Sequence, residues 1–188
     1  MTGEIGIRPA TVDDAAFIAE IVAMAIGDDV ALKEYCGEQY IRVFTAVASE
    51  QNTQYSWQNV FVAECDGKTV GAGVGYDGAL LSILRERTLS IVARETGRTP
   101  VIVDETEAGE YYLDSLGVLP EYRGKGIASQ LVLSICNKAK SLGHQRVGLI
   151  VDEENPQAER LYSAIGFECV GKRVFFGHRM RHLQKVIG

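Results

Sequence analysis

The chain has 188 residues, of which 46% are hydrophobic and 23% are charged, and its formal net charge is −6. This composition excludes a disordered or low-complexity chain, and the length suits one domain, so we interpret residues 1–188 as a single domain. The acidic balance disfavours nucleic-acid binding, and no segment approaches the roughly 18 consecutive apolar residues of a membrane span.

The N-terminus and the cysteines predict a cytoplasmic protein. The opening MTGEIGIRPA lacks the basic start and the long apolar stretch of a signal peptide. Cys36, Cys65, Cys136 and Cys169 form no C-x-x-C pair. We therefore expect four reduced thiols that pack in the core as small apolar side chains.

The first fifty residues predict a strand and two helices. Residues 4–8 alternate and precede Pro9, which is typical of a short strand. Thr11 and Asp14 form a capping-box-like helix start, and apolar residues at helical spacing continue to about Ile26. Residues 34–49 are expected to form the second helix.

A hairpin and a longer helix follow. Residues 59–64 and 69–76 are expected to be strands joined by the two-residue turn Asp66-Gly67. The return strand carries glycine at every second position, which leaves one face bare for close approach of another element. Residues 79–95 predict a helix, and the acidic stretch 101–109 predicts a loop.

The last part of the chain alternates strands and helices and ends in a hairpin, which indicates an α/β domain. The expected elements are a strand at 110–119, a helix at 127–141, a buried strand at 146–151, a helix at 155–165, and a hairpin of strands 167–176 and 179–187 with its turn at Gly177-His178.

The loop before residue 127 carries the clearest chemistry. In the stretch RGKGIA at 123–128, small residues let backbone amides approach an anion, and the helix start adds unpaired N–H groups with partial positive charge. Together they predict a cradle for a phosphate or pyrophosphate. Arg123 and Lys125 can add charge at its rim.

Other interpretations of this loop compete with that one. It does not match the Walker A pattern G-x-x-x-x-G-K-[ST]. A Rossmann fingerprint would use Gly124, Gly126 and Ser129, but about five residues separate it from the strand, and 60 residues after Ala128 are too few for the rest of that fold. On the loop alone, a surface turn that binds nothing stays open.

Two blocks of the sequence resemble the GCN5-related N-acetyltransferase (GNAT) family. Arg123, Gly126 and Ala128 meet that family's acetyl-CoA-binding pattern [RQ]-x-x-G-x-[GA]. The stretch NPQAERLYSAIGF at 155–167 is similar to the family's N-x-x-A-x-x-L-Y-x-x-x-G-F. The two blocks stand in the family's order, whereas residues 77–109 match no family pattern.

The resemblance implies a fold and an activity. The fold would be a mixed, mostly antiparallel sheet with a splayed central parallel strand pair and helices on both faces. The activity would be direct transfer of an acetyl group from acetyl-CoA to a primary amine of a small molecule, in a ternary complex. A non-catalytic acyl-CoA sensor, and an acetyltransferase for a protein N-terminus or lysine, are the alternatives.

The resemblance also implies site residues. Tyr162 matches the family's general acid for the departing thiolate, and Asn155 matches a residue that contacts the cofactor arm. The arm would pair with the strand before the loop, and the pyrophosphate would bind the loop amides. The expected cofactor-binding residues are Leu116, Gly117, Val118, Arg123, Gly124, Lys125, Gly126, Ile127, Ala128, Ser129 and Asn155.

Two acids on the same strand are candidates for the general base. An amine with a pKa of about 10 must lose a proton before it attacks a thioester, and a carboxylate can remove that proton directly or through water. Glu110 and Asp114 lie four residues apart, so they share a strand face unless a bulge intervenes. We prefer Asp114, because Glu110 borders the acidic loop and is expected to be solvated.

The remaining polar residues give weaker expectations. His178 and His182 lie four apart on a predicted strand, which favours a structural or surface role over metal binding, and no metal is expected. The acids between residues 77 and 114 would favour a cationic amine if they flank the acceptor site, and otherwise form a solvated loop. The sequence leaves homodimerisation through the terminal hairpin open.

Overall fold

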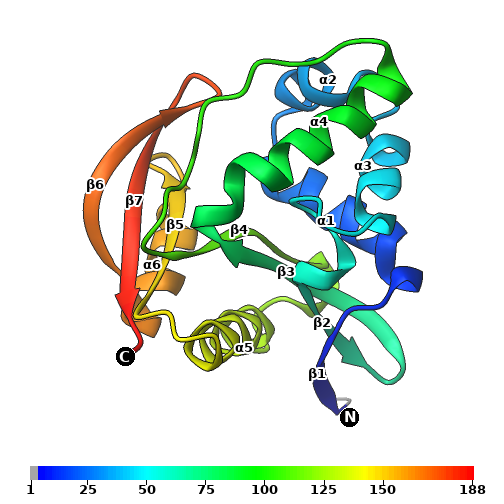
Figure 1. Cartoon of the computed structure of the whole chain (residues 1–188). Coiled ribbons are helices and arrows are strands. Elements are labelled where there is room, and N and C mark those ends of the chain that lie inside the picture. The colour runs from blue at the N-terminus through cyan, green and yellow to red at the C-terminus, as the bar shows by residue number, and fades with distance from the viewer. Residues whose placement is uncertain (1–3) are drawn as a thin grey trace.

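The computed structural model describes residues 4–188 and is built around a seven-stranded sheet (Figure 1). The strand order is β1-β2-β3-β4-β5-β7-β6. Neighbouring strands are antiparallel except β4 and β5, which are parallel. The expected mixed, mostly antiparallel sheet is therefore confirmed.

Most elements lie within two residues of their predicted bounds. The strands are β1 (Ile5–Pro9), β2 (Val60–Cys65), β3 (Lys68–Asp77), β4 (Tyr111–Val118), β5 (Arg146–Asp152), β6 (Glu168–Phe175) and β7 (His178–Val186). The helices are α1 (Ala15–Ile26), α2 (Asp29–Cys36), α3 (Tyr40–Ser49), α4 (Leu81–Thr96), α5 (Ile127–Ser141) and α6 (Pro156–Ile165).

The prediction of one helix over 34–49 is wrong, because the segment 29–49 forms two helices. The Asp28 carboxylate caps α2 by accepting hydrogen bonds from the amides of Val30 and Ala31 at 2.9 and 3.2 Å. Gly37 ends α2 with a φ of +73°. The chain turns at Gly37 before α3 begins. The helical spacing of apolar residues continues from α2 into α3, so this spacing alone did not reveal the interruption, whereas the glycine marks it.

The turn of the last hairpin is displaced by one residue from its prediction. Phe176 and Gly177 both have positive φ, at 47° and 78°, and His178 is already the first residue of β7. The Asp66-Gly67 turn of the first hairpin is confirmed, with φ values of 51° and 77°. Two consecutive positive φ values match the right-handed twist of the flanking strands.

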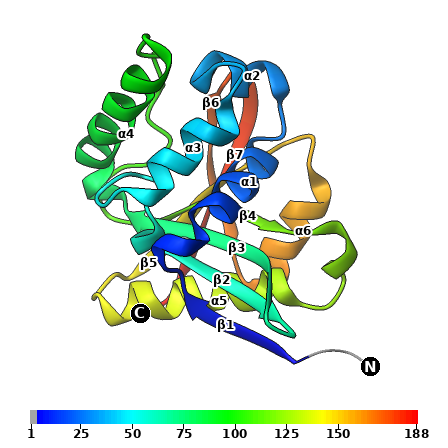
Figure 2. The same ribbon diagram turned by 90° about the vertical axis from the view of Figure 1, so that its right-hand side faces the viewer.

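The glycines of β3 let a helix approach the sheet closely, as the sequence predicts. A Cβ atom at Gly73 would lie 3.0 Å from Cδ1 of Ile135 on α5, and one at Gly71 would lie 3.4 Å from Cγ2 of Ile127. Figures 1 and 2 show α5 on this face of the sheet and α1, α3 and α4 on the other. Helices on both faces are therefore confirmed.

Apolar side chains fill both layers. Phe44 of α3 is buried in the same cluster as Tyr76 of β3 and Tyr112 of β4, and the two tyrosine rings lie 5.9 Å apart between centroids. Ile135 and Leu149 are buried on the opposite face. No helix within residues 4–188 is long and apolar enough to cross a membrane.

The cysteine expectation is correct for three of the four thiols. Cys36, Cys65 and Cys136 are buried and unpaired. Cys169 is also unpaired, but it is exposed on β6, so its predicted place in the core is wrong. The reason is that β6 is an edge strand with one neighbour, β7, and most of its side chains face solvent.

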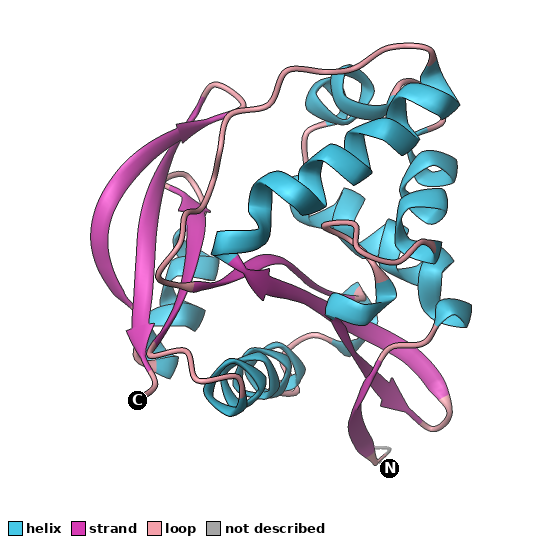
Figure 3. Ribbon diagram, viewed as in Figure 1, coloured by secondary structure: helices cyan, strands magenta, loops and turns pink. Residues whose placement is uncertain are grey.

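The parallel pair at the centre separates soon after it forms. β4 and β5 are paired only at Tyr111 with Val147 and at Tyr112 with Gly148, and Figure 3 shows the two strands diverging beyond that point. The β3–β4 register also shifts there: Gly75 pairs with Leu113, and Val74 pairs with Ser115. The residue left over in this bulge is Asp114.

Candidate active site

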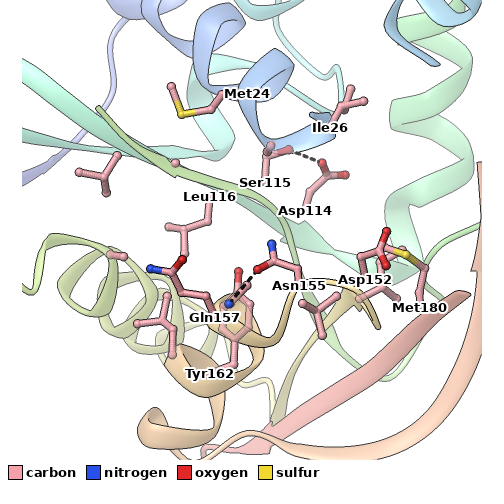
Figure 4. Close-up of a pocket in the computed structure, with 18 of the residues that line it drawn as sticks. Met24, Ile26, Asp114, Ser115, Leu116, Asp152, Asn155, Gln157, Tyr162 and Met180 are labelled. Carbon is pink, nitrogen blue, oxygen red and sulfur yellow. Dashed lines mark hydrogen bonds between the residues drawn. The ribbon is translucent and has the colours of Figure 1, made fainter. Parts of the chain in front are cut away.

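The opening between β4 and β5 leads into a cavity of about 680 Å³. Its walls come from the second half of β4, the loop before α5, the first turn of α5, the start of α6, and the turn between β6 and β7. Figure 4 shows residues of β4 and α6 that line it. The splayed strand pair thus creates the cavity, because a fully paired β5 would occupy the same place.

The second half of β4 forms one wall. Leu116, Gly117 and Val118 line the cavity and pair with β3 on the opposite side. The edge that faces β5 has no strand partner there. An extended amide-bearing ligand can therefore pair with this edge as an additional strand would.

The anion cradle predicted at residues 123–129 is present as geometry. Gly124 and Gly126 both have a φ of +75°, and a Cβ atom on either would meet nothing within 4 Å. The first helical hydrogen bond of α5 runs from the Gln130 amide to the Gly126 carbonyl at 3.1 Å. The amides of residues 127–129 consequently have no partner within the helix, and these residues line the cavity.

The two basic residues of the loop behave differently. Arg123 lines the cavity, and its Nε donates a 3.0 Å hydrogen bond to the Val118 carbonyl, which orients the guanidinium along β4. Lys125 is absent from the lining, and its Nζ lies 4.9 Å from the centroid of the Tyr122 ring. Arg123 therefore lies where its charge could act on a ligand in the cavity, whereas Lys125 lies against Tyr122, and the roles expected for both side chains stay predictions.

Helix α6 and the residue that caps its N-terminus supply two of the predicted residues. The Oδ1 atom of Asn155 accepts a 3.1 Å hydrogen bond from the Ala158 amide and caps the helix, so its Nδ2 is left to donate into the cavity. Tyr162 lies farther along α6, lines the same cavity, and is 8% exposed (Figure 4). Burial raises the pKa of Tyr162 far above its usual value, so the hydroxyl stays protonated and can donate.

The bulge in β4 turns Asp114 toward the cavity. Its Oδ2 accepts a 2.7 Å hydrogen bond from the Tyr76 hydroxyl, and its Oδ1 accepts a 2.9 Å hydrogen bond from the Ser115 hydroxyl. Burial and the nearby negative charge of Glu105 raise the pKa of Asp114 to about 7. A carboxyl group with this pKa exchanges a proton readily at neutral pH.

Glu110, the other candidate, is buried away from the cavity, and the expectation that it is solvated is wrong. Its Oε2 lies 2.8 Å from His182 Nε2 and accepts a 2.7 Å hydrogen bond from Gln184, and Thr106 donates to its Oε1 at 2.7 Å. Burial opposes ionisation, but these hydrogen bonds outweigh it and hold the pKa of Glu110 below its usual value. Its carboxylate ties β4 to β7.

The two histidines also separate in role. His182 is buried against Glu110 and is structural, as the sequence favoured. His178 lines the cavity, with Nδ1 2.8 Å from Oδ2 of Asp152 and Nε2 3.4 Å from Oδ2 of Asp28. It therefore links the end of β5 to the start of α2 across one end of the cavity.

Sequence reasoning missed several lining residues. Tyr112 shares a strand face with Glu110 and Asp114, so strand alternation could have indicated it. Phe175, Phe176 and the cavity-facing His178 come from the β6–β7 turn, and nothing local marks them as site residues. The sequence had left open whether the acids between residues 77 and 114 form a site; of these, Glu105 and Asp114 line the cavity.

Comparison with known proteins gives one consistent family. The sequence model of the Acetyltransferase (GNAT) family matches residues 30–167. A crystal structure titled an acetyltransferase is 32% identical to this chain, covers 97% of it and 100% of its own length, and superimposes with a TM-score of 0.82. The structure of yncA from Salmonella typhimurium, named a putative acetyltransferase, with its cofactor acetyl-CoA shares the fold, with 19% identity, a TM-score of 0.63, and coverage of 98% of this chain and 94% of that one.

Curated relatives match over a shorter stretch. An uncharacterized N-acetyltransferase of Mycobacterium bovis is 38% identical over 63 residues. The matched stretch is 34% of this chain and 40% of that relative's length. These relatives therefore support the family, and they leave the acceptor of this chain to be inferred from its own cavity.

The cradle predicts a specific sensitivity at Gly126. Replacing Gly126 with valine places a β-branched residue at positive φ, so the loop must change shape and the amides of residues 127–129 lose their common direction. Calorimetric titration with acetyl-CoA should show binding weakened by about tenfold or more.

Gly143 provides a matched control for that variant. It lies just after α5, has a φ of +87°, and is likewise open around its Cβ position, but it does not line the cavity. Gly143→Val should carry a similar backbone strain and leave acetyl-CoA binding unchanged. Equal affinities for the two variants would show that the loop is not the anion cradle.

Proposed function

Since the chain belongs to the GNAT acetyltransferase family, we propose that it transfers the acetyl group of acetyl-CoA to a primary amine of a small molecule, in a ternary complex with both substrates. One observation carries this proposal: a single cavity combines an anion cradle, a carboxyl group with a pKa of about 7, and a protonated tyrosine. Because the lining extends from α1 to β7, we further propose that residues 1–188 act as one acetyltransferase domain.

The cavity fits coenzyme A along its length. The pyrophosphate would bind the free amides of residues 124–129, and Arg123 would offset its charge. The pantetheine arm would pair with the open edge of β4 at residues 116–118, and Asn155 Nδ2 would donate to it from α6. When bound, acetyl-CoA supplies an activated acetyl group as a thioester.

Asp114 is the general base in this proposal. An amine with a pKa of about 10 arrives protonated at neutral pH, and the transfer needs its neutral form. Asp114 accepts the proton directly or through one water, and a base titrating near the working pH combines availability with strength. Backbone amides on the open edge of β4 then stabilise the negative charge that develops on the thioester oxygen.

Tyr162 is the general acid. Its hydroxyl lines the cavity from the side of α6, opposite β4 (Figure 4). The raised pKa keeps the proton on the hydroxyl until a thiolate leaves beside it. The base on β4 and the acid on α6 thus approach a bound thioester from two walls of the cavity, which is what proton removal and proton donation in one transfer require.

The acceptor end of the cavity favours a small cationic amine over a protein segment. The β6–β7 turn packs onto α2, where the Phe176 and Tyr35 rings lie 6.2 Å apart between centroids, and His178 contacts Asp28 and Asp152. These contacts narrow the space in which an extended peptide would lie. Carboxylates in the lining add negative potential there, which attracts an ammonium group.

Thiol release with a panel of amines tests the proposal. With acetyl-CoA present, at least one small cationic amine should give steady-state turnover, and peptides presenting a free N-terminus or a lysine should give less. Saturable acetyl-CoA binding without turnover on any amine would favour the sensor alternative. Turnover on peptides alone would favour the protein-modifying alternative.

The carboxyl groups of Glu110, just before β4, and of Asp114, on β4, are expected to differ in effect. Wild-type kcat/KM should fall as the pH drops below about 7, because Asp114 is then protonated and cannot act as a base. Asp114→Asn should lower kcat/KM by roughly 10²–10⁴ and remove that acidic limb.

Glu110→Gln serves as the comparison, because Glu110 is a buried carboxylate near Asp114 in sequence that does not line the cavity. It should lower the free energy of unfolding by about 1–3 kcal/mol, because buried hydrogen-bond partners lose a charged acceptor, and it should keep the acidic limb of the wild type. Urea denaturation and pH profiles measure the two effects. If Glu110→Gln lost the acidic limb of the kcat/KM profile and Asp114→Asn remained active, Glu110 and not Asp114 would be the general base.

Tyr162→Phe should lower kcat by roughly 10²-fold while leaving acetyl-CoA affinity almost unchanged, since only the proton donor is removed. Steady-state kinetics on the best amine of the panel, together with calorimetry, separate the two quantities. A kcat equal to that of the wild type would remove Tyr162 from the mechanism.

A further inference from the structure

Asp114 belongs to a buried polar network that extends beyond the catalytic wall. The Tyr76 hydroxyl, which donates to Asp114 at 2.7 Å, also lies 3.3 Å from Oε1 of Glu105. Gln54 Nε2 lies 3.2 Å from the Tyr76 hydroxyl and 3.1 Å from the same Glu105 oxygen. Three side chains from separate parts of the chain therefore converge behind Asp114.

The hydrogen-bond directions in this network can be assigned. Gln54 must point its NH₂ group at Tyr76 and Glu105, because its amide oxygen would repel the Glu105 carboxylate. The Tyr76 oxygen thus accepts from Gln54 and has one hydrogen to donate. The shorter distance directs that hydrogen to Asp114, where it stabilises the ionised carboxylate.

Glu105 acts on Asp114 through charge. Its side chain is almost fully buried and is paired with Arg85, which also bonds Oδ1 of Asp104 at 2.7 Å and the Val103 carbonyl at 3.2 Å. A second carboxylate on the far side of one hydroxyl disfavours ionisation of Asp114. Tyr76 and Glu105 therefore shift the pKa of Asp114 in opposite directions.

The placement of Glu105 depends on the segment between α4 and β4. This segment runs without a helix or strand from the end of α4 to the start of β4 (Figure 1). Arg85 holds it at residues 103–105, and Arg173 on β6 lies 3.3 Å from Oε1 of Glu107. Gly78 leaves room for it, because a Cβ atom there would collide with the Glu107 carbonyl oxygen.

Resting on the proposed role of Asp114 as the base, we propose that Tyr76 and Glu105 are positioning residues that set the strength of this base in opposite directions. The Tyr76 hydroxyl favours the ionised, proton-accepting form of Asp114, and Glu105 favours the protonated form. The balance keeps Asp114 strong enough to take a proton from an ammonium group and still ionised in a large fraction of molecules at neutral pH.

Other groups around Asp114 enter the same balance. The ionisable and charged side chains that surround it from the packed elements are Tyr76 on β3, Glu105 on the 97–110 segment, Arg85 on α4, Tyr35 on α2, Tyr55 before β2 and Tyr112 on β4. Across the cavity, His178 is paired with Asp28 and Asp152. Only Tyr76 and Ser115 have side chains that donate hydrogen bonds to Asp114 among the described residues.

The titration of Asp114 in the protein alone tests the proposal, and no acceptor is needed. Carboxyl ¹³C NMR of aspartate-labelled protein follows the titration. The signal that is missing from the spectrum of Asp114→Asn is assigned to Asp114. The midpoint should rise by roughly one pH unit in Tyr76→Phe, which removes the donor, and fall by a similar amount in Glu105→Gln, which removes the negative charge. The acidic limb of kcat/KM should move with the midpoint in each variant.

Tyr111→Phe is the matched control, because it removes a buried hydroxyl from β4 that bonds the Gly75 carbonyl at 2.8 Å on the opposite face of the sheet. Its Asp114 midpoint should equal that of the wild type. Equal or same-direction shifts in Tyr76→Phe and Glu105→Gln would overturn the proposal. If Glu105→Gln does not fold, a fall or no change in Tyr76→Phe would overturn it by itself.

These outcomes separate the further inference from the proposed function. Opposite shifts of the midpoint, with an Asp114→Asn variant that remains active, would leave the network intact and remove Asp114 as the base. If the Asp114 midpoint did not move in Tyr76→Phe and Glu105→Gln, but Asp114→Asn lost activity, Asp114 would remain the general base. Tyr76 and Glu105 would then have no role in setting its pKa.

Discussion

The parallel strands β4 and β5 share two residue pairs and then separate, while β4 keeps its antiparallel partner β3. Backbone N–H and C=O groups are costly to leave without partners away from water. The free edge of β4 therefore faces a cavity, where a ligand can supply the missing partners. The loop expected to bind an anion, at the start of α5, lies at the end of the same edge. The separation of β4 from β5 therefore places the free strand edge and this loop in one cavity.

The same strand shows how neighbours decide what a carboxyl group does. Glu110 and Asp114 lie four residues apart, yet their pKa values move in opposite directions. Glu110 meets a histidine and two hydrogen-bond donors, which favour its ionised form. Asp114 is buried near another carboxylate, which favours its protonated form. The difference arises because β7, which is distant in sequence, supplies His182 and Gln184 to Glu110, whereas Glu105 of the segment before β4 lies near Asp114.

Much of the fold could be predicted from local patterns. The hairpin turn at Asp66-Gly67, the strand β4 and the helix α5 follow from glycine positions and apolar periodicity, and those signals act within a few residues. The errors have physical causes too. Gly37 interrupts an apolar spacing that looked continuous, and Cys169 lies on an edge strand whose outer face no element covers.

For this protein the sequence by itself indicated the open glycine-rich loop before α5, because two glycines and a helix start lie together in one short stretch. It also determined the family resemblance, through two contiguous blocks. Only the tertiary structure decided which carboxyl group faces the cavity, that Lys125 turns away onto Tyr122, and that Glu105 stands behind Asp114. Those outcomes depend on how side chains pack in the folded molecule, and for Glu110 and Asp114 on neighbours from other strands and loops, which local sequence patterns do not specify.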